Sequence, residues 1–143
     1  MRARRGGLGL ALLLAWGCGA EPAGDELSPR DARYRVALRS ADPGPLELRF
    51  EPREGWHIEP DATAHLALEA PEGFALPRAE QSGEEALEHS EEALAFGVRL
   101  ERLASGPEQQ VTVRGAVKFG VCRDDASTCE IVRRDLEFEA PAG

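Results

Sequence analysis

Residues 111–138 read VTVRGAVKFGVCRDDASTCEIVRRDLEF, and this stretch decides the fold. Apolar residues alternate with other residues from Val111 to Val121, and the run continues into Cys122. A polar loop follows, and a second extended run begins at Cys129. Alternation with a period of two is typical of a strand with one buried face, so the two runs predict a β-hairpin. The cysteines on either side of the loop are close enough in sequence to form one disulfide.

The same alternation recurs earlier in the chain, in runs that end near proline or glycine. These runs cover residues 33–39, 46–50, 64–68 and 94–100. Short strands with frequent turns and no convincing helix predict an all-β fold, an antiparallel β-sandwich. Gly115 interrupts the longest run, which predicts a β-bulge. Residues 80–92 carry six glutamates, some at like-charge i,i+4 spacing, and this predicts an exposed loop with at most one helical turn.

The first residues have the pattern of a secretory signal peptide. Three arginines within the first five residues precede an apolar run over residues 8–16, and small residues follow. The run is too short for a permanent membrane helix. We expect a signal peptide at residues 1–17 with cleavage before a lipidated Cys18, as in bacterial lipoproteins; the alternative is a cut after Ala20 and ordinary secretion. We expect the first route to anchor the protein in the bacterial cell envelope, on the periplasmic side, and the second to give a secreted or periplasmic protein.

The rest of the chain divides into a tether and one domain. Residues 18–31 mix glycine, proline, alanine and charge without periodicity, which predicts a flexible tether. Residues 32–140 have a common size for a single domain. The net charge is −9, and loss of the three N-terminal arginines makes it −12, so nucleic acid and anionic membrane surfaces are poor partners. Membrane contact is therefore expected only through the lipid anchor.

Two motifs carry a resemblance to a known family. Residues 55–58 read GWHI, and residues 119–122 read FGVC at the end of the longest run, with Cys129 further on. This combination resembles the amino-terminal domain of DsbD, the thiol:disulfide interchange protein. The resemblance implies an immunoglobulin-like fold in the periplasm and a reversible disulfide between Cys122 and Cys129. It also implies that these two catalytic cysteines pass reducing equivalents between thioredoxin-like partners and oxidised client proteins, with no cofactor.

The chain departs from the family pattern around the cysteines. The cysteine loop is longer, and residues 129–133 (CEIVR) contain no proline. The family shields its disulfide with a loop that bears aromatic residues, whereas the acidic segment at residues 84–92 offers only Leu87 and His89 as bulky side chains. The transmembrane and thioredoxin-like domains of the full-length enzyme are not expected in this chain, so we expect separate proteins to donate its electrons. The chain is thus a candidate protein-disulfide oxidoreductase that depends on such partners.

Charges near the cysteines favour a disulfide that is attacked rather than a dithiol that attacks. Asp124, Asp125 and Glu130 disfavour a thiolate, whereas Arg123 and Arg133 favour one. A strand-turn-strand site also has no helix N-terminus to stabilise a thiolate. We therefore expect the reactive thiolate to come from a partner.

The competing interpretation is a binding or structural β-sandwich lipoprotein with an inert disulfide, because most cysteine pairs in secreted proteins are structural. Closing this loop would contribute about 2.5 kcal/mol to stability. The histidines, His57, His65 and His89, have no metal-ligand spacing, so no metal site is expected. Trp56 is expected to be buried against the sheet, with His57 hydrogen-bonded in a turn.

Overall fold

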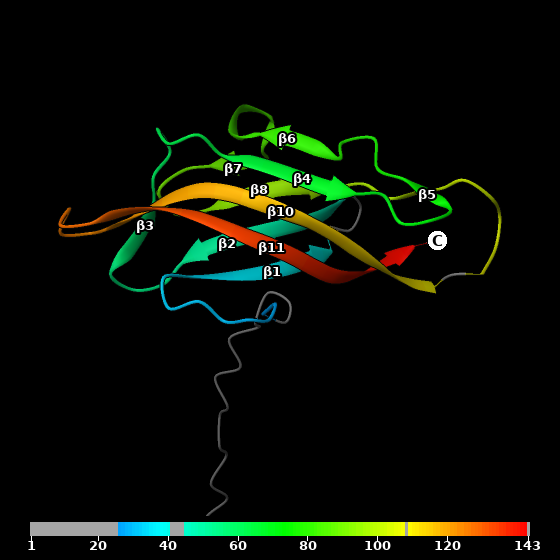
Figure 1. Cartoon of the computed structure of the whole chain (residues 1–143), viewed down its shortest axis with the longest axis horizontal. Helices are drawn as coiled ribbons and strands as arrows, with labels where there is room; N and C mark the ends of the chain where they lie inside the picture. Colours follow the sequence, from blue (N-terminus) through cyan, green and yellow to red (C-terminus); the bar gives the residue numbers. More distant parts are fainter. Residues whose placement is uncertain (1–25, 41–44, 108, 143) are drawn as a thin grey trace, which may run out of the picture.

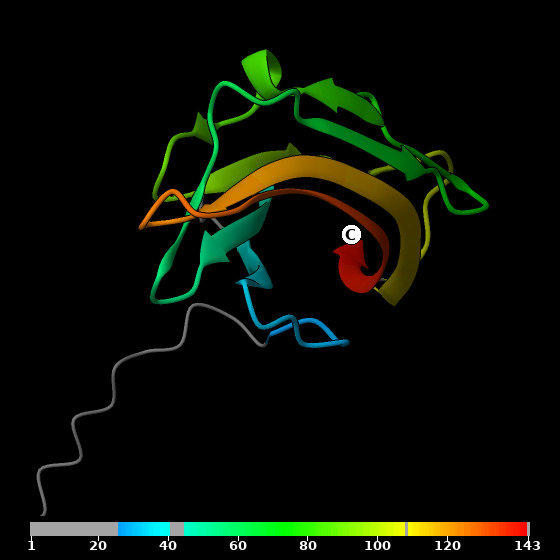
Figure 2. The same ribbon diagram turned by 60° about the vertical axis from the view of Figure 1, so that its left-hand side comes forward.

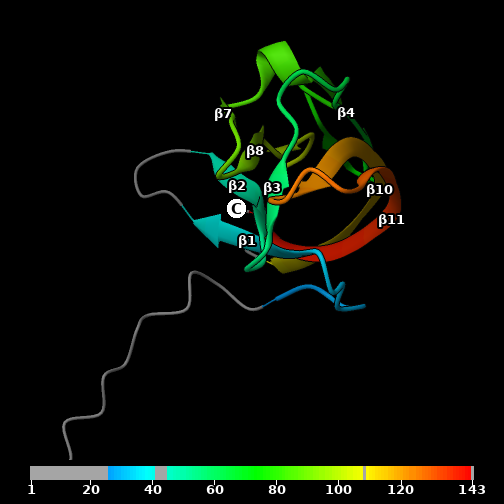
Figure 3. The same cartoon turned by 90° about the vertical axis from the view of Figure 1, so that its left-hand side faces the viewer.

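The structure is a computed structural model, and it describes residues 26–40, 45–107 and 109–142. The expected signal peptide at residues 1–17, the expected lipidation at Cys18 and the alternative cut after Ala20 lie outside these ranges. Most of the described residues belong to antiparallel strands in two packed layers, which Figure 3 shows end-on. The structure confirms the predicted all-β fold, an immunoglobulin-like antiparallel β-sandwich.

The first sheet of the described chain has four strands in the order β1-β2-β8-β7. They are β1 (Tyr34–Ser40), β2 (Leu46–Pro52), β7 (Glu88–His89) and β8 (Leu94–Val98). The alternating runs of the sequence become these strands because one side of each strand faces the core: in β2, Leu48 and Phe50 are fully buried. The three longer strands therefore follow the predicted pattern.

The second sheet is built on one long hairpin. Its strands in the described chain run in the order β11-β10-β4-β6, and β3 pairs with the far end of β10. They are β3 (Trp56–Ile58), β4 (His65–Glu69), β6 (Glu80–Ser82), β10 (Gln109–Arg123) and β11 (Cys129–Ala142). The β10–β11 hairpin spans the length of the molecule in Figure 1 and is strongly curved in Figure 2. The short strands β5 (Phe74–Ala75) and β9 (Glu101–Arg102) pair separately.

An aromatic cluster joins the two sheets in the core. Tyr34 of β1 and Phe119 of β10 have ring centroids 5.1 Å apart, and Phe50 of β2 is also 5.1 Å from Phe119. Phe96 of β8 completes the cluster against Phe50. All four side chains are at most 2% exposed. Phe119 therefore anchors the end of β10 in the core, three residues before Cys122.

Three segments differ from the sequence expectations. Residues 56–58 form β3 rather than a turn, because they pair with the last residues of β10. Residues 80–92 hold β6, the 3-10 turn η1 (Gly83–Glu85) and β7, so the acidic segment is not an open loop, although its single helical turn agrees with the prediction. Gly115 makes no bulge, because the pairing of β10 with β11 and β4 continues through it without an extra residue.

Residues 26–31, which the sequence assigned to the tether, contact the sandwich. Glu26 forms a β-bridge with Ala37, and the Leu27 N–H donates a hydrogen bond to Val36 O at 2.8 Å. The Leu27 side chain is partly buried and packs against the core. The packed domain therefore includes residues 26–31.

Candidate functional site

A disulfide joins Cys122, near the end of β10, to Cys129, at the start of β11. The two residues face each other in the strand register, and their Cα atoms are 4.1 Å apart. One residue nearer the loop, the Arg123 N–H donates to Thr128 O at 2.9 Å. Because bonded and non-bonded pairs alternate in an antiparallel ladder, the cysteines form a non-hydrogen-bonded pair, in which Cα atoms come closest. The predicted disulfide across the hairpin is confirmed.

The two cysteines differ in exposure. Cys129 is exposed, whereas Cys122 is only 3% exposed. The alternation of β10 places Cys122 on the outer face of its sheet, opposite to the core side chain of Val121. Its burial therefore needs a cover on that outer face.

The cover is the turn that follows β3. The Glu59 N–H donates to Gly120 O at 2.9 Å, which holds this turn on β10. A Cβ atom at Gly120 would lie 2.7 Å from the Ala62 Cβ and 3.3 Å from the Glu59 Cβ. Gly120 thus lets the turn lie directly on the sheet beside Cys122.

β3 and the turn after it bring two further polar side chains to the disulfide. His57 is the register partner of Cys122 on the side away from Cys129. Glu59 is two residues after His57, and its Oε2 lies 3.7 Å from the Cys122 sulfur. One ligand-type atom from each of His57, Glu59 and Cys122 lies within 4.8 Å of the others. Two of the strands that pair with β10, β11 and β3, therefore meet at one site.

The loop of the hairpin reaches back to β3. His57 Nδ1 lies 2.9 Å from Asp124 Oδ1, and the Asp124 N–H donates to Gly55 O at 3.0 Å. The guanidinium of Arg123 stacks over the half-buried Trp56 ring, 4.8 Å from its centroid. Residues 55–58 are thus placed beside the cysteine loop by pairing, stacking and hydrogen bonds.

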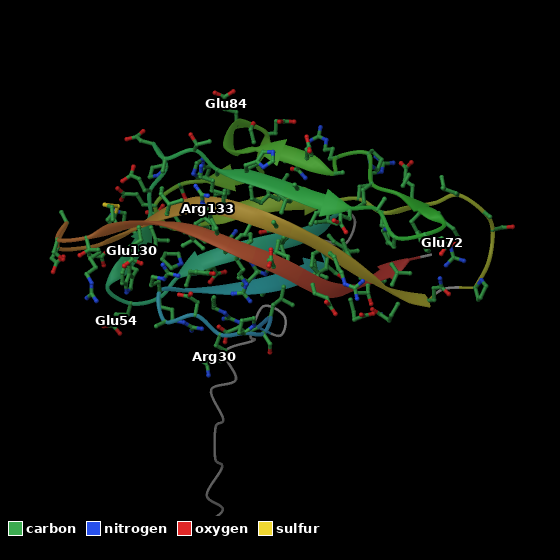
Figure 4. All side chains as sticks on the ribbon, viewed as in Figure 1. Arg30, Glu54, Glu72, Glu84, Glu130 and Arg133 are labelled. Atoms are coloured by element: carbon green, nitrogen blue, oxygen red, sulfur yellow. A yellow bond between two sulfur atoms is a disulfide. The ribbon has the colours of Figure 1, made fainter. Side chains whose placement is uncertain are left out.

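Most of the charges named from the sequence contact other groups. Asp124 contacts His57, as described above. Glu130 accepts a 2.6 Å hydrogen bond from Arg33 Nη1. Hydrogen bonds from the Ser127 side chain and backbone hold the pKa of Asp125 below its usual range. Arg133 is exposed on β11. Figure 4 shows Glu130 at the hairpin end of the molecule, while Glu84 of the acidic segment points away from the body of the domain.

The two bulky side chains of the acidic segment, Leu87 and His89, lie beside the other sheet. Leu87 is 56% exposed and would contact a Cβ at Gly97 of β8 at 3.7 Å, and His89 of β7 pairs with Leu94 of β8. The disulfide is instead flanked by Ile131, which is 54% exposed and follows Cys129 by two residues on the same face of β11. The exposed cysteine of the disulfide, Cys129, therefore has an apolar side chain next to it on the same face.

Glu59 is the residue that the sequence reasoning missed. It is one of many glutamates, and no motif distinguishes it. A signal was present: in an extended segment residues two apart share a face, so His57 and Glu59 of the sequence WHIE point the same way. Only the pairing of β3 with β10 shows that this face meets Cys122.

With this geometry in hand, the chain was compared with known proteins. No family model, curated protein or solved structure matches it. The likeness to the DsbD domain therefore rests on the residues of GWHI and FGVC and on the two cysteines. Among the described residues, no helix has the length and apolar character that crossing a membrane requires.

Proposed function

We propose that the protein is a thiol–disulfide exchange module of the bacterial cell envelope, anchored through Cys18. It passes reducing equivalents between thioredoxin-like partners and oxidised client proteins through the Cys122–Cys129 disulfide. The unequal exposure of the two cysteines carries this proposal, because exchange requires one sulfur that a partner can reach. Ile131 adds an apolar contact for the partner beside the exposed cysteine.

The exchange begins with a thiolate of the partner's dithiol attacking the Cys129 sulfur. A bond forms between these sulfurs, the Cys122–Cys129 bond breaks, and its electron pair leaves with Cys122 as a thiolate. The partner's second thiolate then attacks the partner's own sulfur in the mixed disulfide and releases Cys129 as a thiolate. The partner's dithiol is thereby oxidised to a disulfide, the domain gains two electrons, and water supplies the protons of its two thiols. The reverse sequence reduces a client disulfide.

The surroundings of Cys122 support a partner that supplies most of the reactivity. The Glu59 carboxylate, 3.7 Å from the Cys122 sulfur, repels negative charge on that leaving sulfur. No helix N-terminus adjoins the cysteines within the described hairpin, where strands run directly into the loop. A partner with a stable, reactive thiolate therefore has to supply most of the reactivity.

The reduction potential of the disulfide tests this proposal. A full-length Cys18→Ser variant, which carries only the two site cysteines, is equilibrated in glutathione and thioredoxin redox buffers, and free thiols are then counted by alkylation and mass measurement. We expect a potential less negative than about −300 mV, the upper bound typical of structural disulfides. A protein that stays fully oxidised in all these buffers would instead support the inert disulfide of a structural or binding lipoprotein.

A further inference from the structure

The side chains around Cys122 are of the types that bind metal ions. While the two cysteines form a disulfide, however, neither sulfur is available as a thiolate ligand. His57, Glu59 and Cys122 each offer a ligand-type atom within 4.8 Å of the others. Bonds of about 2.0–2.3 Å to a tetrahedral Zn²⁺ place neighbouring ligand atoms about 3.3–3.8 Å apart. The 3.7 Å between Glu59 Oε2 and the Cys122 sulfur already falls in this range. The imidazole nitrogen lies within 4.8 Å of both atoms, so a shift of about 1 Å would bring it into this range.

Reduction of the disulfide supplies the fourth ligand. Cys129 faces Cys122 directly, with a Cα–Cα separation of 4.1 Å, so both sulfurs remain beside the cluster when their bond breaks. Two electrons and two protons convert the disulfide to two thiols, and a bound metal ion displaces both thiol protons. The set of four ligands is therefore complete only in the reduced protein.

Asp124 supports His57 as a ligand. His57 Nδ1 lies 2.9 Å from Asp124 Oδ1, and with the ring proton on Nδ1 this contact is a hydrogen bond. Nε2 then carries the lone pair that a metal ion takes. Histidine ligands of zinc commonly donate their other ring N–H to a carboxylate, which fixes the tautomer and the ring orientation.

We propose that the reduced protein binds one Zn²⁺ ion through His57, Glu59, Cys122 and Cys129. Two thiolates, an imidazole and a carboxylate form a donor set that suits zinc rather than magnesium or calcium, which prefer oxygen ligands. In the cell the reductant would be the partner dithiol of the proposed function, and bound zinc would hold the thiolates back from exchange. A chemical reductant separates the two proposals, since zinc binding by the phosphine-reduced protein does not depend on exchange with any partner.

The test is metal titration of the full-length Cys18→Ser protein in its oxidised form and after reduction with a water-soluble phosphine, which is oxidised to the phosphine oxide. We expect one Zn²⁺ per reduced chain and none per oxidised chain. Co²⁺ should give the visible bands of a tetrahedral site and thiolate-to-metal charge transfer in the reduced protein alone. Equal binding by both forms would overturn the proposal.

Single substitutions separate the four-ligand site from chelation by two thiols. We expect Glu59→Gln and His57→Gln to weaken Zn²⁺ binding by about 100-fold, and Asp124→Asn by about 10- to 100-fold. Glu130→Gln and His65→Gln are the matched controls, because Glu130 contacts Arg33 and His65 is exposed on β4. Unchanged binding in both Glu59→Gln and His57→Gln would show that the cysteines alone hold the metal.

A second variant guards against loss of the fold on reduction. Cys129→Ser frees the Cys122 thiol without any reductant and keeps His57 and Glu59 beside it. We expect this variant, with its fold checked by circular dichroism, to give tetrahedral Co²⁺ bands at a weaker affinity than the reduced parent. A folded variant without these bands would contradict the proposed ligand set.

Discussion

At the scale of single residues, the two cysteines of one disulfide have opposite environments. Cys122 lies under the turn after β3, with the Glu59 carboxylate 3.7 Å from its sulfur. Cys129 lies open on β11, beside the exposed Ile131. Thiol chemistry depends on access as well as on thiolate character, so the two positions should react at different rates.

We expect a free thiol at Cys129 to react at least about 10-fold faster than one at Cys122, because approach to Cys122 requires the covering turn to open. The measurement compares Cys122→Ser with Cys129→Ser, both carrying Cys18→Ser, in the rate of mixed-disulfide formation with oxidised glutathione. In concentrated urea the two rates should converge, since unfolding removes the cover. Equal rates in the folded proteins would contradict the proposed attack at Cys129.

At the scale of elements, β4 pairs with β10 so closely that only glycine fits at one position. A Cβ atom at Gly115 would lie 2.2 Å from Ala67 O and 2.8 Å from the Leu68 Cα. The glycine that suggested a bulge in the sequence therefore serves the approach of two strands. β4 can pair with β10 at this distance only because residue 115 has no side chain.

We expect Gly115→Ala to destabilise the protein by about 1–3 kcal/mol, because the added methyl group forces the two strands apart. Gly97→Ala in β8 is the matched control, since a Cβ there meets its nearest neighbours at an ordinary 3.7 Å. Chemical denaturation measures both free energies of unfolding. If Gly115→Ala has the same free energy of unfolding as the control, β4 can move away from β10 without loss of stability.

The β10–β11 hairpin is held mainly by its ladder. Its register is continuous from the pair Gln109–Ala142 to the pair Cys122–Cys129, and the disulfide only closes the end of it. We expect Cys122→Ser with Cys129→Ser to remain folded and to lose at most about 2.5 kcal/mol, the loop-closure contribution. Denaturation monitored by circular dichroism checks this expectation. Failure of the double variant to fold would assign the disulfide a structural role instead.

At the scale of the whole molecule, the alternating pattern predicted the strands that have one buried face. β1, β2, β4, β8 and β10 were predicted in this way, because apolar residues alternate along their sequences. Burial follows the same period of two in β2 and β4, whereas Ala95 of β8 is buried as well as its neighbours. The hairpin and its disulfide followed from two such runs with a cysteine at each end of the loop. A local pattern of this kind reports which face is buried, and it does not report which strands become neighbours.

The parts of the site that depend on neighbours could not be predicted for this reason. Residues 56–58 are too few to show a period, and they form β3 only because β10 offers its edge. Glu59 lies at Cys122 only because the turn after β3 folds onto Gly120. The acidic segment likewise gains β7 by pairing with β8, despite a composition that favours a loop.

An ion-pair network connects the beginning of the described chain to the hairpin end. Arg33 donates from Nε and Nη2 to the two carboxylate oxygens of Asp31 at 3.0 and 2.9 Å, and from Nη1 to Glu130 Oε2 at 2.6 Å. The hydrogen bond from the Arg33 side chain holds the pKa of Asp31 below its usual range. Residue 31 is thereby tied to Arg33, which directly precedes β1, and through Arg33 to the residue next to Cys129.

This network makes stability depend on pH in a defined direction. A carboxyl group whose pKa is lower in the folded state binds its proton more weakly there, so its contribution is present above the unfolded pKa of about 3.9. The contribution is lost as the pH falls through the lower folded pKa. We therefore expect the wild type to lose more stability between about pH 5 and pH 3 than Asp31→Asn, which has no carboxyl group to protonate at this position.

The measurement is the free energy of unfolding in urea at both pH values. Asp135→Asn, an exposed aspartate on β11, is the matched control and should follow the wild-type curve. Because Asp31 is partly exposed, salt should reduce the difference between the wild type and Asp31→Asn. If Asp31→Asn loses as much stability as the wild type on acidification, residue 31 is not coupled to the domain through Arg33.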